Sequence, residues 1–155
     1  MEAAYKAMTQ LCARREYCTH DIREKLRARQ LTSEEMTTLL ERMQQENYIN
    51  DARYARAFAH DKLRYDGWGR IKIAQALRIK SISERYIQDA LDELPEEEYL
   101  ETLSRVIRSK QRSVKGKTPY ETRQKLARSV IARGFEPSLV FEEIGSSEEA
   151  PDDDW

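Results

Sequence analysis

The stretch that decides the fold is residues 73–91, IAQALRIKSISERYIQDAL. Its apolar residues follow one another at gaps of four, five, five and four: Ile73, Leu77, Ile82, Ile87 and Leu91. The same gaps occur 51 residues earlier and 53 residues later, at Ile22, Leu26, Leu31, Met36 and Leu40, and at Leu126, Val130, Phe135, Val140 and Ile144. Self-similarity at a nearly fixed period indicates supersecondary modules repeated in series.

Each copy of the pattern predicts a helix, a turn and a second helix. Residues four apart share one helix face, as Ile73 and Leu77 do. The five-residue gap from Leu31 to Met36 fits a hydrophobic staple around a helix that Thr32 caps. Glu35 completes a Thr-x-x-Glu capping box there, and the other two copies carry their own start signals, Ser83 and Pro137.

A further helix is expected before each pair, over about 3–16, after Asn50 and after Pro95. No segment shows sustained alternation of β-branched residues, so no sheet is expected. We therefore predict an all-α fold of three tandem three-helix, helix-turn-helix-like repeats over residues 1–49, 50–94 and 95–145. The remaining residues, 146–155, are predicted to form a disordered acidic tail.

The charges of the chain are segregated although they nearly cancel. The formal net charge of the 155 residues is −1. Residues 62–82 nevertheless carry six Lys or Arg against one acid, and residues 105–133 carry ten against one acid. Residues 89–101 are strongly acidic. Because local fields steer partners, the two basic segments favour an anionic partner over the alternative of a merely solvated face.

No motif predicts an active site. The run Gly116-Lys117-Thr118 lacks the first glycine and the preceding strand of a phosphate-binding loop. Cys12 and Cys18 have no further zinc ligands at suitable spacing, and His20 and His60 have no nucleophile implied by spacing. We expect no enzymatic activity, no cofactor and no metal. Since no signal peptide or membrane-spanning run is evident, we expect a soluble cytoplasmic protein.

Three segments of the chain resemble motifs of the RecX regulatory proteins. Residues 47–55, NYINDARYA, resemble the aromatic–aliphatic–Asx–Asp segment between that family's first two repeats. Residues 67–82 resemble its Gly-x-Gly-x-Arg-Ile block, with Ser81 where the family has Gly. Residues 21–26, DIREKL, resemble a helix in its first repeat. The resemblance spans roughly residues 5–145.

The resemblance implies an elongated, curved array of three-helix repeats in a small cytoplasmic bacterial protein. Such proteins bind the RecA recombinase and its filament on single-stranded DNA. They modulate, mostly by inhibition, its ATPase, strand-exchange and co-protease activities, within homologous recombination, DNA repair and the SOS response. Some members also bind DNA directly, so single- or double-stranded DNA is a second expected partner. We expect a monomer.

The residues expected to contact the partner lie in the two basic segments: Arg70, Lys72, Arg78, Lys80, Lys110, Arg112, Lys115, Lys117, Arg123 and Lys125. An alternative is a helix-turn-helix transcriptional regulator that reads duplex DNA with the second helix of each pair. Exposed glutamates such as Glu34 and Glu142 on those helices disfavour this interpretation. A helical scaffold for an unrelated protein is a third alternative.

Overall fold

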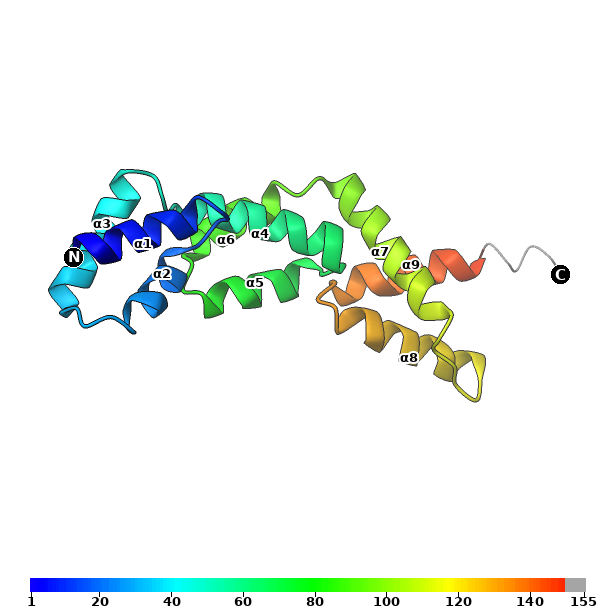
Figure 1. Ribbon diagram of the computed structural model, residues 1–155. Coiled ribbons are helices and arrows are strands. Elements are labelled where there is room, and N and C mark those ends of the chain that lie inside the picture. Colours follow the sequence, from blue (N-terminus) through cyan, green and yellow to red (C-terminus); the bar gives the residue numbers. More distant parts are fainter. Residues whose placement is uncertain (150–155) are drawn as a thin grey trace. The chain divides into compact units, whose positions relative to one another are not determined.

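The computed structural model describes residues 1–149, and the side chains of residues 1–145 (Figure 1). Within this part of the chain there are nine helices and no strand. The helices are α1 (Glu2–Cys12), α2 (Thr19–Leu26), α3 (Ser33–Gln45), α4 (Asp51–Asp66), α5 (Arg70–Ile79), α6 (Glu84–Asp92), α7 (Glu96–Gln111), α8 (Pro119–Ile131) and α9 (Pro137–Glu149). Three helices begin in each expected repeat, which confirms the all-α, three-helix prediction.

The helices begin at the predicted cap residues. The Thr32 side chain accepts a hydrogen bond from the Glu35 N–H (3.1 Å), and the Glu35 carboxylate accepts one from the Thr32 N–H (2.9 Å). Asn50 Oδ1 accepts from the Arg53 N–H at 3.0 Å and so caps α4. Both residues of the staple at the start of α6 are buried, Ile82 before the helix and Ile87 within it. Local capping chemistry therefore sets these helix starts.

Two helix ends differ from the sequence prediction. Helix α1 ends at Cys12 and not at residue 16, because Glu16 leaves the helix to pair with Arg53. Helix α9 continues to Glu149, past residue 146 where the acidic tail was expected to begin. Glutamate is a good helix former, and two glutamates at 148 and 149 extend the helix. The rest of the expected tail, 150–155, lies outside the described residues.

The chain forms two compact units. Unit 1 comprises residues 1–57 and 77–90, and unit 2 comprises residues 58–76 together with the chain from residue 91 onward. The second repeat therefore contributes residues to both units, since the division passes through α4, α5 and α6.

Unit 1 has an apolar core between α1, α2 and α3. The buried members of this cluster are Ala4, Met8, Ile22, Leu26, Leu39, Leu40, Met43 and Ile49. Three of them belong to the repeated pattern that predicted the fold, namely Ile22, Leu26 and Leu40. The periodic residues of the first repeat thus form its core, as an amphipathic helix requires.

Unit 2 packs α7, α8 and α9 against one another (Figure 1). Its most buried side chains include Tyr99, Leu103, Val130, Phe135 and Val140. The rings of Tyr99 and Phe135 lie 5.4 Å apart between centroids, with planes tilted by 54°. Tyr99 is the only one of these five with a polar side-chain atom, and its hydroxyl belongs to the polar network described below.

The two cysteines are free thiols in unit 1. Cys18 is the fully buried N-cap residue of α2, and burial raises the pKa of its thiol to about 11. Cys12 is half-buried, and burial together with the nearby Glu16 carboxylate raises the pKa of its thiol as well. Both thiols are therefore protonated and poorly reactive at neutral pH.

Candidate partner-binding surface

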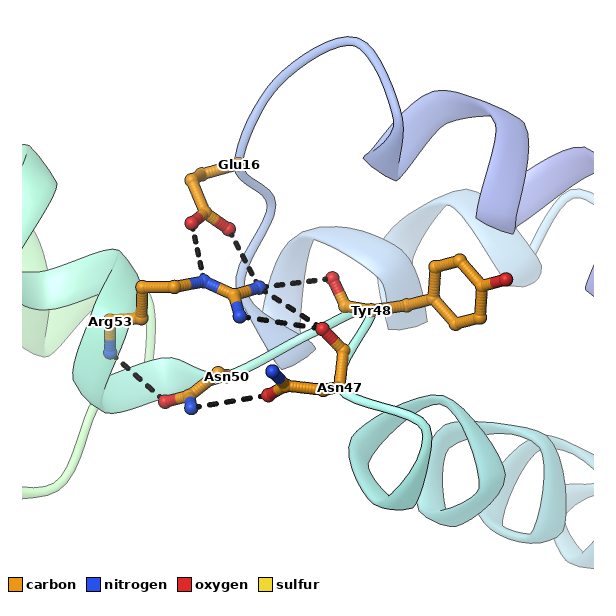
Figure 2. A network of polar contacts seen from close by, with 5 residues as sticks. All are labelled: Glu16, Asn47, Tyr48, Asn50 and Arg53. Atoms are coloured by element: carbon orange, nitrogen blue, oxygen red, sulfur yellow. Dashed lines mark hydrogen bonds and ion pairs between the residues drawn. The ribbon is translucent and has the colours of Figure 1, made fainter.

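The polar residues of the segment 47–55 hold unit 1 together (Figure 2). The Arg53 guanidinium donates to both carboxylate oxygens of Glu16, at 2.5 and 3.1 Å. It also donates to the backbone carbonyls of Asn47 and Tyr48, at 3.3 and 3.4 Å. Arg53 therefore caps the end of the α3 segment and ties the chain after α1 to the start of α4 (Figure 2).

A second polar contact of this segment fixes α2. The Asp51 carboxylate accepts hydrogen bonds from the Thr19 N–H at 2.8 Å and from the Thr19 hydroxyl at 3.0 Å. Asp51 thus stabilises the first turn of α2 from a position 32 residues later in the chain. The segment 47–55 therefore stabilises the fold of unit 1, because its charged residues Asp51 and Arg53 are hydrogen-bonded to other residues of that unit.

Lys80, one of the expected partner-binding residues, forms an ion pair inside unit 1. Its ammonium lies 2.5 Å from Asp21 Oδ1, and the Asp21 side chain is only 10% exposed. Burial alone would raise the pKa of Asp21, but hydrogen bonds from Lys80 and from the Cys18 N–H outweigh it and hold the pKa below its usual value. The charge of Lys80 is therefore balanced by a nearly buried carboxylate.

Arg78 is also paired, but on the surface of unit 1. Its guanidinium donates to both oxygens of the Glu84 carboxylate, at 2.5 and 3.2 Å. Both side chains are exposed. A partner that offers a carboxylate or a phosphate would have to compete with Glu84 for the same fork.

Arg70, at the first position of α5, belongs to a half-buried network in unit 2. Its guanidinium donates to Glu136 Oε2 and to Glu96 Oε2, each at 2.7 Å, and its Cζ lies 3.7 Å from the centroid of the Tyr99 ring. The Tyr99 hydroxyl donates to Glu136 and accepts from the Arg70 N–H. Only 23% of the Arg70 side chain is exposed. This arginine is engaged on all sides within the unit.

The same network shifts the pKa values of Glu136 and Tyr99. Burial alone would raise the pKa of the Glu136 carboxyl, but the hydrogen bonds from Tyr99 and Arg70 outweigh it and keep the pKa below its usual value. Burial and the hydrogen bond to Glu136 raise the pKa of Tyr99 above its usual value. A carboxylate beside a neutral phenol and a guanidinium is the stable arrangement at neutral pH.

The turn that precedes α5 is bonded to the turn between α8 and α9. The Gly69 N–H donates to the Arg133 carbonyl (2.8 Å), and the Ile71 N–H donates to the Gly134 carbonyl (2.9 Å). A Cβ at Gly69 would lie 2.5 Å from the Gly134 backbone, and Gly134 itself has a left-handed φ of +97°. The Gly-x-Gly block thus permits close backbone approach within unit 2.

Lys72 and Trp68 lie together beside this turn. The Lys72 ammonium is 4.5 Å from the centroid of the Trp68 indole, and the Lys62 ammonium is 4.6 Å from it. The indole also meets the Phe58 ring edge-on, with centroids 6.3 Å apart. Trp68 is half-buried, and these contacts anchor the turn before α5.

The segment after α7 has a different character. We use the name cationic loop for Lys110, which lies in the last turn of α7, together with Arg112, Lys115 and Lys117, which follow this helix. Arg112, Lys115 and Lys117 are exposed, and none of the four forms an ion pair with a carboxylate in the described part of the chain. The backbone is held nevertheless, since the Gly116 N–H donates to Thr122 Oγ1 (2.9 Å) and the Lys117 N–H donates to Glu121 (3.0 Å).

Helix α8 adds two exposed cations next to the cationic loop. Lys125 lies 3.5 Å from the Glu121 carboxylate and also reaches the Lys115 carbonyl at 3.5 Å. Arg123 is exposed and has a partner in the structure. Of the ten expected residues, eight belong to unit 2 and two, Arg78 and Lys80, belong to unit 1.

The structure brings together three functional candidates that the sequence analysis did not select. Arg105, Arg133 and the exposed Tyr65 line one hollow with Lys110 in unit 2. They come from α4, α7 and the turn after α8. The only sequence signal was the overall basic bias of residues 105–133, which does not indicate which cations converge.

The described residues offer no other kind of site. They contain no group of three or more His, Cys, Asp or Glu side chains that could hold a metal ion. No helix in residues 1–149 combines the length and the apolar character needed to cross a bilayer.

The comparisons with known proteins all match this chain to the same family, RecX. A model of the second three-helix domain of RecX matches residues 50–91, and a model of the third matches residues 96–144. A regulatory protein RecX from Pasteurella multocida is 30% identical over 139 residues, which cover 89% of this chain and 84% of that protein. One from Haemophilus influenzae (strain PittEE) is 25% identical over 146 residues, covering 94% and 95% respectively.

Two solved structures have the same fold. A crystal structure of regulatory protein RecX matches with a TM-score of 0.82 at 25% identity, over 89% of this chain and 68% of that chain. The crystal structure of RecX from Lactobacillus salivarius matches with a TM-score of 0.83 over 94% of each chain. The second pair is 16% identical in sequence, so that likeness concerns the fold alone.

Proposed function

The chain belongs to the RecX family of regulatory proteins, and from this membership we propose that it is a non-enzymatic regulator that binds the RecA recombinase and its filament on single-stranded DNA. Binding modulates, chiefly by inhibition, the ATPase, strand-exchange and co-protease activities of RecA. The protein acts in the cytoplasm as a monomer without a cofactor, in recombination and in the DNA-damage response.

The observation that supports a binding role most strongly is the cationic loop. Its exposed lysines and arginine have no carboxylate partner among the described residues, whereas Arg70 and Lys80 do. Surface charges that a fold does not use internally are available to an acidic protein surface or to phosphates. Several weak contacts on one linked chain add avidity without a deep pocket.

The duplex-reading alternative finds less support. Its readers would lie on the second helix of each pair, α3, α6 and α9. On α3 the exposed side chains include Glu34 and Glu41, and on α9 they include Glu142. Carboxylates in these positions would face the phosphates that flank a groove, which is unfavourable.

The test reverses two charges of the cationic loop. The double variant Lys115→Glu, Lys117→Glu should inhibit the single-stranded-DNA-dependent ATPase of RecA about tenfold less effectively, as read from the concentration that gives half inhibition. Its free energy of unfolding should stay within about 0.5 kcal/mol of the parent value, because neither side chain carries a described ion pair.

The matched control is Lys6→Glu with Arg29→Glu, which changes the net charge by the same amount at exposed positions of unit 1. This control should inhibit nearly as well as the parent chain. Equal loss in both double variants would mean that net charge matters and the loop does not. A parent chain that leaves RecA ATPase unchanged and fails to sediment with RecA filaments would refute the proposed function itself.

A further inference from the structure

A hollow of about 240 Å³ opens in unit 2 at the C-terminal end of α4. Its lining includes Tyr65 and Asp66 from α4, Arg105, Ser109 and Lys110 from α7, and Arg133 from the turn after α8. We call this the α4-end notch. Sites for whole small ligands are usually about 300–1,000 Å³, so a hollow of this size suits one group of a longer molecule.

Two arginines of the notch already show its preference for oxygen ligands. Arg105 donates to the Arg64 carbonyl at 3.3 Å, and Arg133 donates to the Asp66 carbonyl at 2.9 Å. These carbonyls form the negative end of α4, so the two guanidiniums neutralise the helix dipole there. A guanidinium has five N–H donors, and each described bond uses one of them. Donors therefore remain for an incoming anion.

The charge balance of the notch is positive. Arg105, Lys110 and Arg133 supply three cations, and the only acid in the lining is Asp66. That carboxylate is already bound by Lys62, whose ammonium lies 2.8 Å away. Three converging cations without an available carboxylate attract an anion, and two arginine forks favour one with several oxygens, such as a phosphate.

The exposed Tyr65 indicates which kind of anion would bind in the notch. Its side chain is 74% exposed although it is a large aromatic residue, and it lies at the same notch. An exposed ring beside cations is the arrangement with which proteins hold single strands, since a base stacks on the ring while cations bind the backbone. A simple carboxylate from an acidic protein segment would leave this ring without a partner.

We propose that the α4-end notch binds one phosphodiester of a single-stranded nucleic acid, with the neighbouring base stacked on Tyr65. The inference deepens the proposed function, because a regulator of a filament on single-stranded DNA would then hold the strand as well as the protein. The contact requires no RecA, and so it can be measured on this chain alone.

The experiment is a salt titration of binding. The 155-residue chain is titrated with a fluorescein-labelled oligo-dT strand by fluorescence anisotropy at several salt concentrations. Each lost phosphate contact should reduce the slope of log K against log[salt] by about 0.7. Arg105→Gln and Lys110→Gln should each reduce the slope by up to this amount, because both cations are proposed to neutralise the same phosphodiester. The matched control is Arg108→Gln, an exposed arginine of the same helix that does not line the notch, and its slope should equal that of the parent chain.

Tyr65→Ala tests the stacking separately. It should weaken strand binding about fivefold or more while the salt slope stays unchanged, because no charge is removed. Tyr120→Ala is the control, since Tyr120 is 65% exposed and does not line the notch. The Lys110 ammonium has no described hydrogen bond or ion pair, so Lys110→Gln keeps the test valid even if Arg105→Gln perturbs the end of α4. Circular dichroism and thermal unfolding monitor the fold of each variant.

The outcomes separate the two proposals. Three results would each refute the proposal for the notch. They are equal salt slopes for Arg105→Gln and Arg108→Gln, full strand affinity in Tyr65→Ala, and no strand binding by the parent chain. If the parent chain inhibits RecA while the notch variants bind DNA normally, the proposed function is supported and the proposal that the notch binds DNA is refuted. If the notch variants weaken DNA binding as expected but the parent chain does not affect RecA, the proposal for the notch is supported and the proposed function is refuted.

Discussion

The first turn of α5 and the cationic loop are both rich in Lys and Arg, yet unit 2 uses their charges differently. Arg70 in the first turn is bound by Glu96 and Glu136 and lies on the Tyr99 ring. Lys115 and Lys117 in the loop are exposed and have no carboxylate partner among the described residues. Charge counted along a sequence is thus not the same as charge available to a partner. We expect substitutions in the first region to change stability and substitutions in the second to change binding.

The largest effect should come from the turn that places Arg70. In Gly69→Ala the new Cβ would lie 2.5 Å from the Gly134 backbone, which must then move. We expect a loss of about 2–3 kcal/mol in the free energy of unfolding, measured by urea denaturation. Gly145→Ala is the control, because no described atom lies within 4 Å of its Cβ and alanine suits a helix. The control should be unchanged or up to about 1 kcal/mol more stable.

Removing the guanidinium itself should have a smaller effect. Arg70→Ala leaves the half-buried Glu136 without its ion pair, so we expect a loss of about 2 kcal/mol in the free energy of unfolding. Arg112→Ala is the matched change in the cationic loop and should alter stability by less than about 0.5 kcal/mol. Similar losses in the two variants would remove the distinction between the two regions.

The smallest expected effect depends on pH. The pKa of Glu136 is lower in the folded protein than its ordinary value. Its ionised form therefore contributes stability above the pKa of the unfolded chain, and this contribution is lost as pH falls through the folded pKa. Glu136→Gln should cost about 1 kcal/mol at pH 7, as followed by thermal unfolding. The difference between parent and variant should shrink on acidification below the usual pKa of glutamate. A difference that grows in acid would contradict the network.

The helical repeat could be predicted from sequence because its determinants are local. The gap pattern of Ile73, Leu77 and Ile82 follows helix geometry, and Thr32 with Glu35 forms its capping box within four residues. The length of α1 could not be predicted in this way. Glu16 suits a helix by propensity, but its carboxylate is held by Arg53, which is 37 residues away in the chain.

The candidate site was only partly predictable for the same reason. The exposure of Lys115 and Lys117 follows from a Gly-containing polar loop, and the structure agrees. Arg70 was expected to contact a partner, yet its side chain reaches Glu136, which is 66 residues away in the chain. Arg133 lines the α4-end notch, and its backbone carbonyl accepts a hydrogen bond from the N–H of Gly69, which is distant in the chain. Contacts between distant segments decide which cations remain available.

The protonated state of the two native thiols has a practical consequence. Cys18 is fully buried, and the pKa of both thiols is raised, so maleimide reagents should modify them slowly. A cysteine introduced at the exposed position 113, as Ser113→Cys, would react much faster and would keep every cation of the loop. A dye attached there would report, by a change in its emission, the approach of the partner proposed for the cationic loop, with both native cysteines left in place.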